Sequence, residues 1–156
     1  VILEGNSQLI IRDTAFSGCS KLNAVYIQNV ATWCNISFSD SEANPLTFAH
    51  NLYINNSPTT TLEIPSGVTS IGNYAFYGCT NLSSIKLENG LDFSGTINVD
   101  IYMNGCPKLT VDSLLSLLNA LADGVTDKTC KIGSTNLAKL TEEQKAIATD
   151  KGWTLE

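Results

Sequence analysis

The stretch AFSGCSKL at residues 15–22 returns, almost unchanged, as AFYGCTNL at residues 75–82. When residues 9–29 are aligned with residues 69–89, the identical pairs are Ile11/Ile71, Ala15/Ala75, Phe16/Phe76, Gly18/Gly78, Cys19/Cys79, Leu22/Leu82 and Asn29/Asn89. A weaker third copy, GCPKL, occupies residues 105–109. Catalytic motifs are rarely duplicated inside one domain, whereas structural units often are. Internal similarity at this spacing therefore predicts a repeat architecture.

The apolar residues of each copy follow the spacing L-x-x-L-x-L, which is typical of leucine-rich repeats. In the first copy these positions hold Leu22, Val25 and Ile27, and residues 82–87 repeat them. Because side chains alternate along a strand, Val25 and Ile27 are expected to face the core while Tyr26 points away from it. A coil of this kind buries one face against the next coil and is not stable alone.

The repeated AFxGC segment predicts a short turn with fixed roles for its residues. Phe16 and Phe76 are expected to anchor the core. Gly18 and Gly78 are expected to end the turn, where a positive φ is easiest for glycine. The cysteine that follows each glycine is expected to point inward, which makes buried free thiols of Cys19, Cys79 and Cys106.

Composition excludes several classes of protein. The chain has 156 residues, enough for one domain with a core, and 43% of them are hydrophobic. The net charge of −6 opposes binding to nucleic acid and electrostatic docking on an anionic membrane. No apolar run reaches 18 residues, so no membrane insertion is expected. The chain opens with VILEGN and lacks an initiator Met, which indicates a fragment of a longer protein.

Between the two clear copies the pattern loosens. Residues 52–56 and 61–67 predict two further strands, with the leucine and isoleucine of each facing inward. Residues 31–50 depart from the repeat and predict a long connection packed by Trp33, Phe38 and Phe48. After residue 96, TINVDIYMN alternates, with Met103 inward and Tyr102 outward.

The last third of the chain changes character. TVDSLLSLLNALADG has helical leucine spacing, with Thr110 as N-cap and Gly124 as the stop. CKIG predicts a strand, and WTLE predicts a closing edge strand. In TEEQKAIATDKG, Thr141 and Gln144 have the spacing of a capping box. Larger helices of this kind are expected where an open repeat end must be covered.

Candidate chemical sites are few. His50 is the only histidine, and no local signature pairs it with a nucleophile, so a surface or structural role is favoured. DSEAN at residues 40–44 resembles the start of a calcium loop, but Pro45 replaces the required glycine, which favours a polar turn. The five cysteines lack the spacing of a zinc site. No catalytic residue, cofactor or metal is therefore expected.

The segment IPSGVTSIGNYAFYGCTNLSSIKL at residues 64–87 resembles the BspA-like leucine-rich-repeat family of bacterial surface proteins. The segment at residues 33–55 is similar to a variant coil of such proteins, and LTEEQKAIATDKGWTL is similar to the end that often follows their repeats. The resemblance implies an extracellular or cell-surface bacterial protein with adhesion or protein-binding roles. It transfers no catalytic residue, because the family motif is a packing motif.

These observations together predict an α/β fold, a short leucine-rich-repeat solenoid with parallel strands and a helical C-terminal cap. The solenoid is expected over residues 1–109 and the cap over residues 110–156. The predicted function is non-enzymatic binding or adhesion, with a host or bacterial surface protein or glycan as partner. The alternative is a structural spacer or terminal cap of a larger repeat protein, without a ligand of its own. The expected binding residues on the concave sheet face are Tyr26, Tyr53, Lys86, Glu88 and Tyr102.

Overall fold

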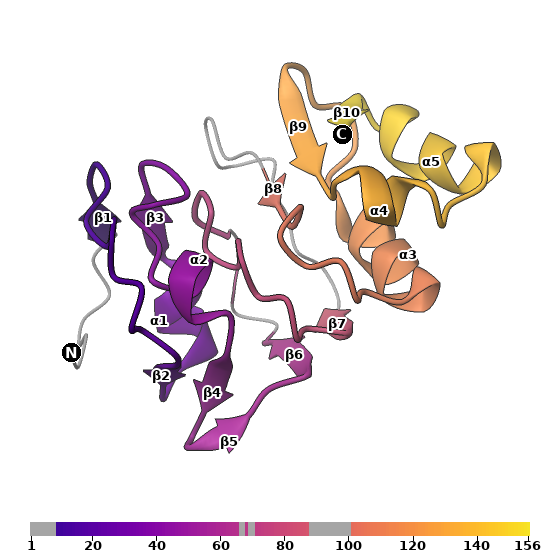
Figure 1. Cartoon of the computed structure of the whole chain (residues 1–156). Helices are drawn as coiled ribbons and strands as arrows, with labels where there is room; N and C mark the ends of the chain where they lie inside the picture. Colours follow the sequence, from indigo (N-terminus) through magenta and orange to yellow (C-terminus); the bar gives the residue numbers. More distant parts are fainter. Residues whose placement is uncertain (1–8, 66–67, 69–70, 88–100) are drawn as a thin grey trace.

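The computed structural model describes residues 9–65, Val68, residues 71–87 and residues 101–156. It has mixed helix and strand content with parallel strand pairs, and its strands form two rows (Figure 1). The upper row in Figure 1 contains β1, β3, β8 and β9, and the lower row contains β2, β4, β6 and β7. The chain passes between the rows, so that strands far apart in sequence lie side by side in each.

In the upper row, β1 (Leu9–Ile11) pairs in parallel with β3 (Ile36–Phe38). Further along, β8 (Ile101–Tyr102), β9 (Lys128–Lys131) and β10 (Trp153–Leu155) form a second parallel sheet with β9 in the middle. Residues 71–73 continue the row beside β3 without forming a strand. There the Phe38 amide donates to the Asn73 carbonyl at 3.0 Å.

In the lower row, β2 (Val25–Ile27) pairs in parallel with β4 (Leu52–Ile54), and β5 (Ser57–Pro58) turns back antiparallel to β4. Next along the chain, β6 (Thr61–Ile64) pairs in parallel with β7 (Ser84–Leu87). The strands predicted at residues 52–56 and 61–67 are therefore present, with shorter bounds. Leu52, Leu62 and Ile64 are buried as the alternation predicts.

The strand pairs β1–β3 and β2–β4 have the same displacement in sequence, so residues 9–35 and the residues that follow them form two successive coils of the repeat. Leu9 pairs with Ile36 and Val25 pairs with Leu52, a displacement of 27 residues in each case (36 − 9 and 52 − 25). The expectation that residues 31–50 form a long connection outside the repeat is therefore wrong. That segment forms α1 (Val30–Cys34), β3 and α2 (Leu46–Ala49), a coil of its own. Residues 33–55 resemble a variant coil in sequence, but without the AFxGC phrase the sequence gives no register for pairing with the first coil.

The two AFxGC turns have the same backbone geometry. Gly18 and Gly78 have φ values of +75° and +85°, as expected for a residue that ends this turn. In each turn the cysteine amide donates to the phenylalanine carbonyl three residues earlier, at 3.0 Å for Cys19 and 3.3 Å for Cys79. The repeated phrase thus encodes a repeated local structure.

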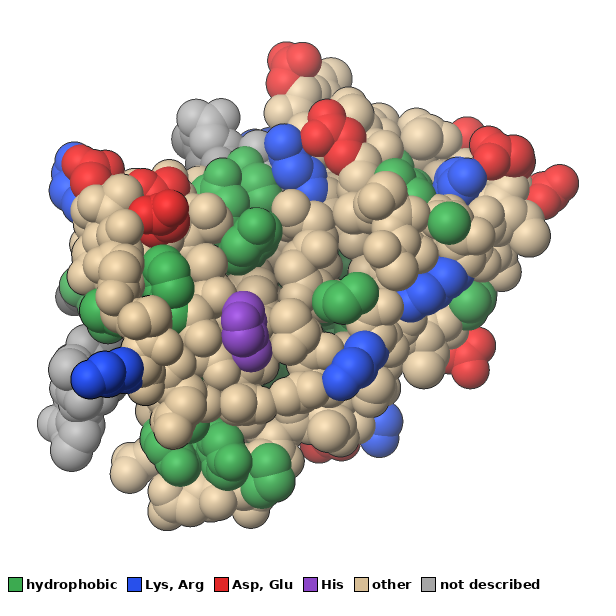
Figure 2. Space-filling view, viewed as in Figure 1, with side chains coloured by type: hydrophobic (Ala, Val, Ile, Leu, Met, Phe, Trp, Pro, Cys, Tyr) green, Lys and Arg blue, Asp and Glu red, His purple; other side chains and the backbone are tan. Residues whose placement is uncertain are grey.

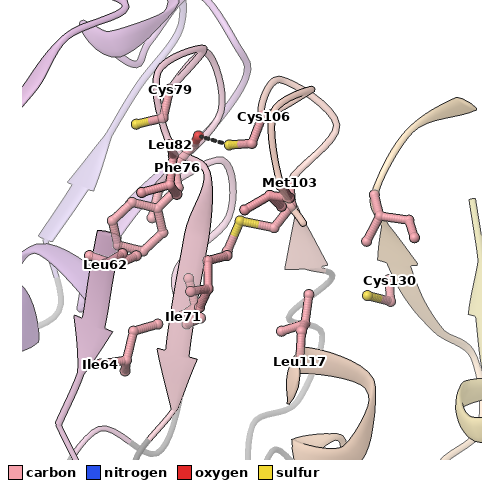
Figure 3. Close-up of a cluster of buried hydrophobic side chains, with 14 of the residues drawn as sticks. Leu62, Ile64, Ile71, Phe76, Cys79, Leu82, Met103, Cys106, Leu117 and Cys130 are labelled. Atoms are coloured by element: carbon pink, nitrogen blue, oxygen red, sulfur yellow. Dashed lines mark hydrogen bonds between the residues drawn. The ribbon is translucent and has the colours of Figure 1, made fainter. Parts of the chain in front are cut away.

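The core lies between the two rows, and a cluster of its buried hydrophobic side chains surrounds the second AFxGC copy (Figure 3). Phe76 is fully buried, and Cys79 and Cys106 are buried thiols, as predicted. The corresponding prediction for Cys19 is wrong, because this thiol is exposed. Phe16 is only half-buried and does not anchor the core. The physical reason is that no coil among the described residues covers the outer side of the first turn.

Side chains from neighbouring coils satisfy the buried carbonyls of the turns. The Asn44 amide donates to the Tyr74 carbonyl at 2.6 Å, and the Trp33 indole donates to the Ala75 carbonyl at 2.8 Å. The Cys106 thiol donates to the carbonyl of Phe76 at 3.2 Å, the dashed line in Figure 3. An unpaired buried carbonyl would cost about 1–3 kcal/mol, so these bonds fix how neighbouring coils pack.

The last third of the chain supplies larger helices, as expected. α3 (Val111–Ala120) is capped by the Thr110 side chain and ends before Gly124. It packs against β7, where the Ile85 amide donates to the Ser113 hydroxyl at 3.2 Å. After the short helix α4 (Ser134–Leu137), α5 (Glu142–Thr149) begins with the predicted capping box.

The two phenylalanines of the repeat give a matched test of this packing. Phe76→Ala should lower the free energy of unfolding by roughly 3–5 kcal/mol, the range for emptying a large aromatic site in a core. Phe16→Ala should cost roughly 1–2 kcal/mol, because a half-buried ring leaves a smaller cavity. Urea denaturation measures both. Equal losses for the two variants would contradict the different burial of the two turns.

Candidate binding surface

The outer face of the lower row carries a pair of stacked tyrosines. Tyr26 on β2 and Tyr53 on β4 are register partners, and their ring centroids lie 4.7 Å apart with an interplanar angle of 27°. Their neighbours Val25 and Ile27 pack against the core, so alternation directs the rings outward. Tyr26 is 59% exposed, which makes it the most exposed of the large hydrophobic side chains described. The two rings therefore lie together on the outer face of β2 and β4, with Tyr26 exposed and Tyr53 half-buried.

The turn after β4 extends this apolar surface. Pro58 on β5 is exposed and is the register partner of Tyr53. Figure 2 shows hydrophobic side chains gathered at the lower edge of the molecule, where Figure 1 places β2, β4 and β5. We call Tyr26, Tyr53 and Pro58 the tyrosine patch. Tyrosine suits contact with a partner because it offers a large amphipathic surface and loses little conformational entropy.

A charged pair lies on the next two strands of the row. Lys86 on β7 lies 3.4 Å from Glu63 on β6, and both side chains are about two-thirds exposed, at 66% and 69%. An exposed pair of this kind contributes little to stability, so both charges are available to a partner. Glu63 was not predicted as a site residue, although the alternation of TLEI already places it outward. Glu88, which was predicted, lies outside the described residues.

Tyr102 does not join the tyrosine patch, which corrects the prediction of one common surface. It lies on β8 in the upper row and stacks on Tyr74, with ring centroids 4.1 Å apart and an interplanar angle of 20°. Tyr77 meets Tyr74 edge-on, and the Lys131 ammonium lies 5.6 Å from the centre of the Tyr102 ring. Alternation gives the direction of a side chain within its strand, but not which row the strand joins.

The buried thiols are poor candidates for catalysis. Burial raises the pKa of Cys34, Cys106 and Cys130 to about 12, and it also raises the pKa of Cys79. The thiolate is the reactive form of cysteine, so these four groups are unreactive near neutral pH. His50 is exposed, and its Nδ1 lies 3.2 Å from the Gly78 carbonyl oxygen, a structural contact between coils.

The DSEAN segment forms a turn rather than a metal loop. Asp40 accepts hydrogen bonds from the Ala43 amide at 2.6 Å and from the Thr14 amide at 3.3 Å. Both of its carboxylate oxygens are therefore engaged by backbone amides. Across the described residues, no three His, Cys, Asp or Glu side chains come together as metal ligands could. A search of the described helices also finds none that is long and apolar enough to cross a membrane.

Comparison with known proteins identifies the repeat. A family model, the BspA type leucine rich repeat region, matches residues 2–57 and 47–110 and gives six copies. No curated protein and no solved structure matches the chain. The matched ranges contain both AFxGC turns, the GCPKL copy and every residue of the tyrosine patch.

The thiol environments predict how stability depends on pH. In the unfolded chain a thiol ionises near pH 9, while folded Cys130 ionises near pH 12. The unfolded state therefore loses its proton first, and stability falls as pH rises from about 9 to 12. At pH 10.5 the loss should be about 2 kcal/mol for each such thiol.

Urea unfolding under reducing conditions at pH 8 and pH 10.5 measures this effect, with Cys130→Ala as the matched control. The control should lose less stability between the two pH values than the parent chain loses. An identical loss in both proteins would show that ionisation of Cys130 does not oppose folding.

Proposed function

Because the chain belongs to the BspA-type leucine-rich repeat family, we propose that it is a non-enzymatic interaction module of a secreted or cell-surface bacterial protein. Its role is adhesion or recognition of a protein or glycan on a host or bacterial surface. The family match over residues 2–110 supports a surface repeat module. The raised thiol pKa values and the structural contact of His50 give no support to an enzyme.

The proposed architecture is a short solenoid, residues 1–109, closed by a cap, residues 110–156. The common 27-residue displacement in both rows supports stacked coils at the start of the chain. The packing of α3 on β7 supports a cap that joins the last coil directly. Three bonds from the Lys151 ammonium to carbonyls at the end of α3 hold the cap itself together.

The tyrosine patch is the proposed contact site, and the exposure of Tyr26 is the observation that carries it. A ring that is 59% exposed and held by stacking on Tyr53 meets a partner without reorganisation. Lys86 and Glu63 add one charge of each sign on neighbouring strands, which gives polar contacts that fix orientation. With a net charge of −6, a protein or glycan is favoured over nucleic acid.

The second candidate is the spacer or terminal-cap role, and the polar first turn of α5 near the C-terminus favours it. The first turn of α5 presents Glu142 and Glu143 to solvent, and the capping box seals its backbone amides. A polar end of this kind terminates a row of coils and prevents further stacking.

The binding proposal is tested with a Tyr26→Ser/Tyr53→Ser variant on glycan arrays and immobilised extracellular-matrix proteins. For any partner that binds the parent chain, affinity should fall by at least tenfold, since two central aromatic contacts are lost. Tyr77→Ser, which lies outside the tyrosine patch, is the matched control and should bind as the parent does. Equal binding by the double variant would exclude the tyrosine patch. Absence of binding by the parent across both arrays would favour the spacer role.

The cap is tested by deleting residues 110–156. The deletion exposes the side of β7 that α3 covers, including buried Ile85, so the remnant should aggregate or lose cooperative unfolding. Size-exclusion chromatography with light scattering, together with thermal denaturation, measures this. A monomeric fragment that unfolds cooperatively would instead make residues 110–156 an independent domain.

A further inference from the structure

Two pairs of tyrosines stack between neighbouring coils. Tyr26 and Tyr53 have ring centroids 4.7 Å apart at an interplanar angle of 27°, and Tyr74 and Tyr102 have ring centroids 4.1 Å apart at 20°. Phenol rings this close are neighbours that a one-electron oxidant can join covalently. The two pairs differ in how firmly the surrounding structure holds the rings, so each serves as a comparison for the other.

The backbone sets Tyr26 and Tyr53 directly opposite each other. They are register partners in the parallel pair of β2 and β4, and strands paired in this way lie about 4.8 Å apart. Both side chains leave the same face of the sheet, because Val25 and Ile27 pack against the core. Since the two side chains start from opposed positions and their rings stack, the hydroxyl-bearing ends of the rings lie side by side.

Exposure leaves the Tyr26 ring free to turn. This side chain is 59% exposed, and the half-buried Tyr53 has the exposed Pro58 as its partner on β5. These strands lie at the lower edge of the molecule, away from the C-terminal helices (Figure 1). Exposed side chains change rotamer within nanoseconds, so the pair passes readily from a stacked to an edge-to-edge arrangement, in which ring carbons can bond.

The second pair is held from more sides. Tyr77 meets the Tyr74 ring edge-on, and the Lys131 ammonium lies 5.6 Å from the centre of the Tyr102 ring. Tyr74, Tyr77 and Tyr102 are all half-buried. A ring that is packed on several sides keeps its stacked orientation, so the edge-to-edge arrangement is closed to this pair.

We propose that Tyr26 and Tyr53 form a site of oxidative cross-linking, where a dityrosine bond joins the first two coils. Hydrogen peroxide, used by a haem peroxidase, removes one electron and one proton from each phenol and is reduced to two molecules of water. A carbon–carbon bond then forms between the ring carbons beside the two hydroxyls. The hydrogen on each coupled carbon moves to the phenoxyl oxygen of its own ring, which breaks the two carbon–hydrogen bonds and restores both hydroxyls.

The bond closes a loop between residues 26 and 53, within which the chain forms α1, β3 and α2. A cross-link restricts the unfolded chain and leaves the paired strands in place, so it favours the folded state. The first two coils are thereby stapled together. The modification does not depend on whether the tyrosine patch contacts a partner.

The test applies hydrogen peroxide and a haem peroxidase to the full chain and to three variants in which phenylalanine keeps the ring but lacks the hydroxyl. All four proteins carry Cys19→Ser, because the exposed thiol competes for the oxidant. Dityrosine fluorescence of the monomer, isolated under denaturing and reducing conditions, should fall at least tenfold in Tyr26→Phe and in Tyr53→Phe. It should stay within twofold of the parent value in Tyr102→Phe, the matched control from the second pair.

Peptide mapping locates the bond directly. Cleavage after Glu42 and Glu63 places Tyr26 and Tyr53 in different peptides. In the oxidised parent these two peptides should be joined, with a mass two hydrogens below their sum. The joined monomer should also unfold at a higher urea concentration than the untreated protein, and an equal or lower midpoint would remove the stapling role.

Three results would overturn the inference. Parent-level fluorescence in Tyr53→Phe, or a matching loss in Tyr102→Phe, would show that a different pair couples. Dityrosine found only in covalent dimers would show that the bond joins two chains. A parent monomer without dityrosine after oxidation would show that the stacked rings do not reach the bonding arrangement.

Discussion

The close approach of successive turns is the constraint on which the rest of the structure depends. The backbone of one coil runs so near Gly78 and Gly105 that a single Cβ atom would lie 2.7 Å or less from main-chain atoms of the neighbouring coil. At this spacing the turn carbonyls are removed from water and must be satisfied by the adjoining coil. Asn44, Trp33 and Cys106 perform this role at three consecutive carbonyls of one turn, those of Tyr74, Ala75 and Phe76. The order of the coils is therefore specified by polar bonds as well as by apolar packing.

The same stacking explains why cysteines at equivalent positions of the repeat are buried in one turn and exposed in another. Cys79 and Cys106 are sealed between coils, and burial raises the pKa of both thiols. Cys19 has the same local sequence and the same turn geometry but is exposed, because nothing described packs on its outer side. The exposure of each thiol depends on what packs on its turn, since the local turn is the same at Cys19 and Cys79.

The division into two rows separates the aromatic side chains into two groups. Tyr26 and Tyr53 stack across neighbouring strands of the lower row, while Tyr102 stacks on Tyr74 in the upper row. Both groups are held by ring contacts between coils, so each stabilises the stack as well as offering surface. Only the lower group combines a highly exposed ring with a neighbouring exposed proline. The proposed partner therefore meets the lower row.

The sequence alone determined the repeat, its glycine-ended turns, the inward positions of β4 and β6, and the caps of α3 and α5. Each of these depends on residues close together in the chain, through alternation, a positive φ or a side chain that caps its own helix. Only the tertiary structure decided how residues 31–50 pair with the first coil, that Tyr102 lies apart from Tyr26, and that Cys19 is exposed. These features depend on which segments pack together 27 or more residues apart. Local patterns cannot encode that choice, because burial is set by the neighbouring coil and not by the motif itself.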